Sequence, residues 1–115
     1  MIFEMDIMMI LYSKFLVPKG YTGITLFPFV FLKSKHLRTN KVLINHERIH
    51  IRQQIELLVL PFYIWYGLEY VIRLIKCRNH QRAYRNISFE REAYINEKDL
   101  SYLKRRRLYT FVKYL

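Results

Sequence analysis

Two histidines four residues apart, His46 and His50, constrain the fold of this chain more strongly than any other feature of its sequence. Residues at this spacing project from one face of an α-helix about one turn apart, so one tetrahedral Zn²⁺ ion can accept a nitrogen from each. Glu47 lies one step round the same helix, where it can act as a general base on a zinc-bound water without binding the metal itself. Residues 46–50 therefore predict a helix-borne HExxH zinc site.

A catalytic zinc site needs a third protein ligand and one open position. The residues that can supply the third ligand are His36, His80, Glu90 and Glu92. Glu90 falls at the start of a predicted helix over 89–99, and Ala93 is a small residue on the same face. Such a residue lets two helices approach closely enough to share a metal. The alternative is a pair of surface histidines on a charged helix, because Arg48 and Arg52 lie nearby.

The N-terminal part of the chain predicts β-structure. Residues 7–17 and 21–32 are rich in β-branched and aromatic residues and flank the turn sequence Pro18-Lys19-Gly20, so they predict an antiparallel β-hairpin. Pro28 indicates that the second strand is an edge strand or is interrupted at this point.

The rest of the chain predicts helices. The first, over 41–60, has Thr39 or Asn40 as its cap and ends or kinks at Pro61. The other expected features are a helix over 62–76, a basic linker over 77–87 that can include a short helical turn, a helix over 89–99 capped by Ser88, and a last helix from residue 99 or 101 to 112. We therefore expect one α+β, mainly helical domain over 1–115, in which the hairpin packs on three to four helices.

The segments NHERIH (45–50) and FEREAY (89–94) together resemble the motifs of the gluzincin metallopeptidases. In the Ste24/HtpX-type peptidases the second motif reads E-x-x-A-D, so the resemblance implies that Glu90 binds zinc and that Ala93 takes the small-residue place. The short chain with one hairpin resembles the soluble minigluzincins, which implies a minimal zincin-like domain. Most of residues 21–115 is also similar to a family of small bacterial proteins with NHExxHxxQQ and NISFEREAY segments, which brings no established activity with it.

Tyr94 departs from this pattern, because the peptidases have Asp at its place. That Asp orients a metal-binding histidine through a hydrogen bond, and a phenol brings no negative charge. The resemblance thus implies weaker metal binding or turnover, or a role for another carboxylate such as Glu97. Gln53 shares the face of His46 and could contact substrate or the free nitrogen of a ligand, or be a solvated residue of the helix. The group that stabilises an oxyanion is left open among Tyr84, His80 and Arg91.

The charge of the chain favours anionic partners. Its formal net charge is +11, from 20 Lys and Arg against nine Asp and Glu, which attracts nucleic acid, acidic lipid or acidic peptide alike. No RNA-binding motif, zinc-finger spacing or helix-turn-helix accompanies the basic run 104–107, so nucleic acid is not an expected partner. The uncharged segment 57–68 is shorter than the roughly twenty residues of a spanning helix. We expect it to be buried or to lie in a membrane interface, with a true span as the remaining alternative.

Three classes of function stay open. In the first, a zinc-dependent peptidase, Glu47 activates the water that attacks a peptide or protein substrate, and the strand over 24–32 presents its edge to the extended chain. The second is a catalytically inactive scaffold stabilised by zinc. The third is a basic protein that binds an anionic membrane surface or nucleic acid, with an incidental HExxH. Glu4 and Asp6 lie where a basic leader is expected, which predicts no signal peptide and a cytoplasmic protein that can contact the inner membrane peripherally.

Overall fold

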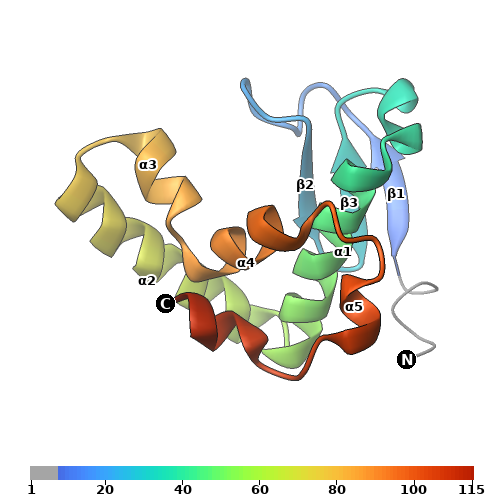
Figure 1. Cartoon of the computed structure of the whole chain (residues 1–115). Coiled ribbons are helices and arrows are strands. Elements are labelled where there is room, and N and C mark those ends of the chain that lie inside the picture. The colour runs from blue at the N-terminus through green and yellow to red at the C-terminus, as the bar shows by residue number, and fades with distance from the viewer. Residues whose placement is uncertain (1–7) are drawn as a thin grey trace.

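The computed structural model describes residues 8–115, and helices account for more than half of them (Figure 1). The α+β, mainly helical fold class is therefore confirmed. The elements in chain order are β1 (Met9–Tyr12), β2 (Gly23–Leu26), β3 (Phe29–Leu32), the 3₁₀ helix η1 (Lys35–Thr39), α1 (Lys41–Glu56), α2 (Leu60–Cys77), α3 (His80–Arg85), α4 (Ser88–Asn96), α5 (Tyr102–Arg105) and the 3₁₀ helix η2 (Thr110–Tyr114). The absence of a signal peptide, predicted from Glu4 and Asp6, concerns residues outside the described part.

The three strands form one sheet in the order β1-β3-β2. β2 and β3 are antiparallel, with Gly23 opposite Leu32, whereas β1 runs parallel to β3. The predicted hairpin between 7–17 and 21–32 is therefore wrong, because the segment 21–32 folds into a hairpin by itself. The interruption predicted at Pro28 is confirmed, and it lies at the turn between the two antiparallel strands. Proline has no N–H for the ladder, so a turn is a favourable place for it.

One side of the sheet packs on α1, which lies beside the strands in Figure 1. Asn40 caps this helix, since its side chain accepts a hydrogen bond from the N–H of Leu43 at 3.1 Å. This contact confirms one of the two caps that the sequence offers. The buried residues of this interface are Val30, Leu32, Ile44 and Ile51.

The first helix ends earlier than predicted. α1 stops at Glu56, and Leu58 and Val59 have positive φ angles of 59° and 64° before α2 begins at Leu60. Pro61 lies in the first turn of α2, where an N–H would have no helical partner, so it starts the second helix rather than ending the first. α1 and α2 are bent by 113° relative to each other. No single helix within residues 8–115 has the length and apolar content of a membrane-spanning helix, whereas this bent pair taken together does.

The start of α4 is held by a residue from another helix. The predicted cap, Ser88, is instead the first residue of α4, and Ile87 before it makes no side-chain cap. The N–H and the hydroxyl of Ser88 both donate to the carboxylate of Glu69 on α2, which also accepts from Trp65 Nε1 at 2.9 Å. A carboxylate is favourable at a helix N-terminus because the first N–H groups lack partners there. Glu69 therefore fixes the helix that carries Glu90.

The C-terminal segment does not form the single helix predicted up to residue 112. α5 ends at Arg105, and Arg106 is extended and buried between α5 and η2. Phe111 on η2 is buried against Phe89 of α4, with ring centroids 4.5 Å apart. The basic linker predicted over 77–87 does contain a short helix, which is α3.

The uncharged segment 57–68 is not buried as a whole. Among the residues of α2 only Phe62 and Glu69 are buried. Leu60, Ile64 and Leu68 are exposed, so the prediction of a buried helix is wrong for the outer face of α2.

Candidate metal centre

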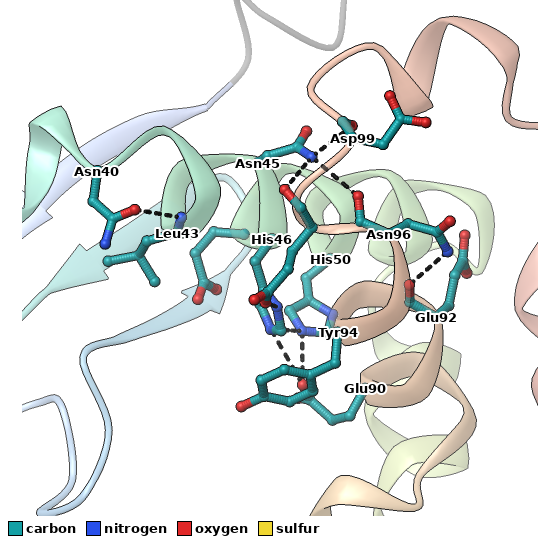
Figure 2. Close-up of polar contacts among 12 residues, drawn as sticks. Asn40, Leu43, Asn45, His46, His50, Glu90, Glu92, Tyr94, Asn96 and Asp99 are labelled. Carbon is teal, nitrogen blue, oxygen red and sulfur yellow. Dashed lines mark hydrogen bonds and ion pairs between the residues drawn. The ribbon is translucent and has the colours of Figure 1, made fainter.

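Three buried side chains from α1 and α4 bring their donor atoms together in the interior (Figure 2). His46 Nε2 and His50 Nε2 lie 3.1 Å apart. Glu90 Oε1 is 3.3 Å from the first nitrogen and 3.1 Å from the second. One donor atom from each residue lies within 4.8 Å of the other two, so this group could hold a metal ion.

The other candidates for a third ligand have different partners. His36 on η1 and His80 on α3 are each hydrogen-bonded to neighbouring hydroxyl groups. Glu92 forms a buried ion pair with Arg106. The structure therefore brings Glu90 alone of the four candidates to the two histidines.

The groups around His50 favour its protonated form. Burial by itself lowers the pKa of His50, but the carboxylates of Glu90 and Glu47 and the hydrogen bonds to Glu90 and Gln53 raise it to about 9. Burial also opposes the charge of Glu90, yet the charged His50 and hydrogen bonds from both histidines hold the pKa of Glu90 well below its usual range. Two imidazole nitrogens and one carboxylate oxygen all present lone pairs to one another here, so a proton or a metal ion must lie among them. A divalent metal ion would satisfy all three donors at once.

Each histidine is oriented by a second partner, as metal-binding histidines usually are. His46 Nδ1 lies 2.8 Å from Glu97 Oε1, and His50 Nδ1 lies 2.8 Å from Gln53 Oε1. Glu97 thus provides the negative charge that Tyr94 lacks, which is one of the alternatives left open by the sequence. Gln53 meets the free nitrogen of a histidine, which is one of the two contacts expected for it.

The position of Glu97 depends on an asparagine of α1. Asn45 Nδ2 donates to the backbone carbonyl groups of Glu97 and Asp99 at 2.8 and 2.9 Å (Figure 2). These bonds tie the chain at the end of α4 to α1, and they place Glu97 beside His46. Nothing in the sequence around Asn45 indicates this function.

Tyr94 and Ala93 pack beside the cluster. The Tyr94 ring packs edge-on against the imidazole of His46, with centroids 4.5 Å apart, and its hydroxyl lies 3.3 Å from that of Tyr84. Ala93 is fully buried against Ile49 of α1, which is the close helix contact expected from a small residue.

Tyr66 on α2 holds the second oxygen of Glu90. Its hydroxyl donates to Glu90 Oε2 at 2.7 Å. Burial, together with the nearby Glu90 carboxylate, raises the pKa of this hydroxyl, so it acts as a hydrogen-bond donor and not as an anion. The sequence did not reveal this residue, because it lies in an uncharged segment whose composition indicates only burial or membrane contact.

Glu47 lies next to the cluster but is not one of its donors. Its Oε1 accepts a hydrogen bond from the Thr25 hydroxyl on β2 at 2.5 Å. A β-carbon on Gly23 would lie 3.4 Å from Glu47 Oε2 and 3.1 Å from the side chain of Leu32, so the glycine lets β2 approach closely. Glu47 is therefore held between the sheet and the histidines.

A pocket of about 380 Å³ opens onto these residues. The three donor residues and Glu47 line it together with β2, while most of the remaining wall is aromatic. Of the oxyanion candidates, Tyr84 and His80 line the pocket and Arg91 does not. Tyr21 also lines it and is hydrogen-bonded to His80 at 2.9 Å. This position could not be predicted, because Tyr21 directly follows a predicted turn and carries no motif.

The chain matches no protein-family model, no curated protein and no solved structure. The resemblance to gluzincins therefore depends on the two segments 45–50 and 89–94. The structure adds that donor atoms of His46 and His50, from the first segment, lie within 4.8 Å of a carboxylate oxygen of Glu90, from the second.

Proposed function

We propose that the chain is a zinc-dependent metallopeptidase with His46, His50 and Glu90 as metal ligands and Glu47 as general base. The observation that carries this proposal is that three donor atoms converge in the same pocket that holds Glu47. A zinc ion bound there would polarise a peptide carbonyl group and lower the pKa of water.

The chemistry of the donor set supports zinc. Two imidazole nitrogens and one carboxylate oxygen are the three protein ligands of many catalytic zinc sites, with a fourth position left open. Magnesium and calcium prefer sites made of oxygen atoms alone. The partners of both Nδ1 atoms leave each Nε2 directed at the centre of the cluster.

The residues around the cluster have complementary functions in this proposal. Glu47 takes a proton from water and delivers it to the leaving amine, while Thr25 fixes one of its oxygens. Tyr84 is the candidate to donate a hydrogen bond to the carbonyl oxygen as negative charge develops there. Burial, with the Glu90 carboxylate nearby, raises the pKa of the Tyr84 hydroxyl, so it keeps the proton that it must donate.

The pocket indicates how a peptide would bind. β2 is an edge strand of the sheet, and its residues 23–26 line the pocket beside Glu47. An extended peptide could pair with this edge through its backbone. The aromatic wall, which includes Phe62 and Tyr63, favours an apolar side chain near the cleaved bond.

Metal analysis tests this assignment directly. We expect the protein purified without chelator to contain about one zinc ion per chain, and a chelator to lower its melting temperature. His46→Ala should lose the ion and the effect of the chelator. His36→Ala, which removes a histidine outside the cluster, should keep both. Equal zinc content in the two variants would contradict the site.

A peptide library then tests the reaction. Cleavage that stops on chelation and returns with added zinc would support the peptidase. Stoichiometric zinc without any cleavage would instead favour the inactive scaffold. The assignment of the metal ligands would still hold in that case.

Glu97→Gln is expected to weaken zinc binding by about 10–100-fold, because the amide no longer stabilises the imidazole of His46 with a negative charge. The affinity can be measured by competition with a chromophoric chelator. Asp99→Asn is a matched control, since it removes a surface carboxylate two positions after Glu97 without changing the backbone carbonyl that binds Asn45. If both variants bind zinc equally well, Glu97 does not support His46.

A further inference from the structure

The outer face of α2 carries a stripe of exposed apolar side chains. Their spacing places them along one side of the helix, and each is between 50% and 70% exposed. They are Leu60, Ile64, Leu68, Val71, Ile72 and Ile75. A contiguous apolar surface of this kind marks a contact site on a folded protein.

The opposite face of α2 holds the helix firmly in place. Phe62 and Tyr66 pack on Phe89 of α4, with ring centroids 4.4 and 6.1 Å apart. Trp65 packs on Phe111 of η2 and donates to Glu69, while 38% of it stays exposed. α2 lies at one side of the molecule next to α3 and the C-terminal segment (Figure 1). The stripe is therefore a fixed surface of a packed helix.

Acidic side chains are nearly absent from the surface of the described chain. Of the nine acidic residues, Glu4 and Asp6 lie outside residues 8–115, which leaves seven. Five of these have buried carboxylates, and they are Glu47, Glu56, Glu69, Glu90 and Glu92. The other two, Glu97 and Asp99, lie together after α4 with side chains that are 22% and 40% exposed.

Basic residues, in contrast, remain at the surface. All 20 Lys and Arg fall within residues 8–115, and of these only Arg52 and Arg106 are buried. Lys76 and Arg78 are exposed at the end of α2. Lys113 is exposed on η2, whose Phe111 packs on Trp65. The apolar stripe is thus set in a cationic surface.

We infer that the outer face of α2 binds the surface of an anionic lipid membrane. An interfacial helix places its apolar side among the first carbons of the acyl chains and its basic residues at the lipid headgroups. The surface of a partner protein would present charges of both signs, whereas a surface almost free of acids matches a plane of uniformly negative charge. This membrane contact is independent of the proposed peptidase activity.

Trp65 provides a direct measurement, because it is the one tryptophan of the chain and lies next to the stripe. Vesicles of phosphatidylglycerol should shift its fluorescence to shorter wavelength, and lipids brominated on the acyl chain should quench it. Vesicles of phosphatidylcholine should do neither. Added salt should weaken the binding, because it screens the charges of both surfaces.

Two substitutions and a matched control test the surface itself. Leu68→Asp and Ile72→Asp should each lower partitioning into phosphatidylglycerol vesicles about tenfold or more, because a charge replaces an apolar group that would enter the lipid. Leu16→Asp changes a leucine of similar exposure, 55%, in the connection between β1 and β2, and should leave partitioning unchanged. Circular dichroism and the melting temperature verify that all three variants fold.

Several results would overturn the inference. One is equal binding by the Leu68→Asp variant and the Leu16→Asp control, and another is equal binding to both lipids. If sedimentation without vesicles shows a dimer, and Leu68→Asp dissociates it, the face binds a second copy of the chain instead. Binding to nucleic acid but not to vesicles would show that the surface charge serves a different partner.

Discussion

Replacing Glu47 with Gln is expected to leave zinc binding intact and to lower kcat/KM for peptide cleavage by about 10²–10⁴-fold. The amide keeps the shape of the carboxylate, and its oxygen can still accept the hydrogen bond from Thr25. It cannot accept the proton that a general base must take from water. The three donor residues are unchanged, so the metal should stay.

The metal content separates the function of Glu47 from that of a ligand. If Glu47→Gln loses both zinc and activity, Glu47 holds the metal, and its assignment as base is wrong. Equal turnover in wild type and variant would contradict the mechanism altogether. Thr25→Val provides a graded comparison, because it leaves the carboxylate in place but removes its hydrogen bond. It should lower kcat with little change in zinc content, and Thr25→Ser should restore most of the loss.

The central part of the site could be predicted because it depends on local geometry. The helical period fixes the relative direction of His46 and His50 whatever packs around them. Glu90 could be placed on a second helix, and the resemblance of residues 89–94 to a known motif supplied the pairing with the first. Glu97 could be proposed as the nearest spare carboxylate, although the sequence did not indicate that Asn45 would hold it there.

Other parts of the site depend on contacts that no local pattern records. Tyr66 donates a hydrogen bond to Glu90, which is 24 residues away in the chain. Thr25 donates one to Glu47, which is 22 residues away. Their surroundings in the sequence are typical of a buried helix and of an ordinary strand. Their positions follow only from the way α2 and β2 pack against α1 and α4, which is a property of the whole fold.

The errors in the fold have the same origin. Alternating apolar residues indicate strands but not whether neighbouring strands run parallel, so the pairing of β1 with β3 could not be read from residues 9–12. Pro61 is compatible with the end of one helix and with the first turn of the next. Ser88 is a good local cap, yet Glu69 from a distant helix supplies the stronger, charged partner.

A buried arginine near the C-terminus connects the two helices of the site. Arg106 pairs with Glu92 of α4 and with Glu56 at the end of α1, and the side chains of all three are at most 1% exposed. Burial by itself lowers the pKa of Arg106, but the two carboxylates raise it above its usual value. Glu92 also accepts a hydrogen bond from Gln53 at 2.9 Å, and Gln53 in turn orients His50.

Arg106→Met is therefore expected to lower the free energy of unfolding by about 3–5 kcal/mol, because it leaves two buried carboxylates without a countercharge. Urea denaturation measures the change, and Arg105→Met is the matched control. Arg105 pairs with Asp99 at the surface, where the side chains are 60% and 40% exposed, so its loss should change stability far less than the loss of Arg106. Adding Glu92→Gln to Arg106→Met should recover part of the stability, since it removes one of the unpaired charges. If the two arginine variants unfold at the same urea concentration, the buried ion pairs do not hold α1 and α4 together.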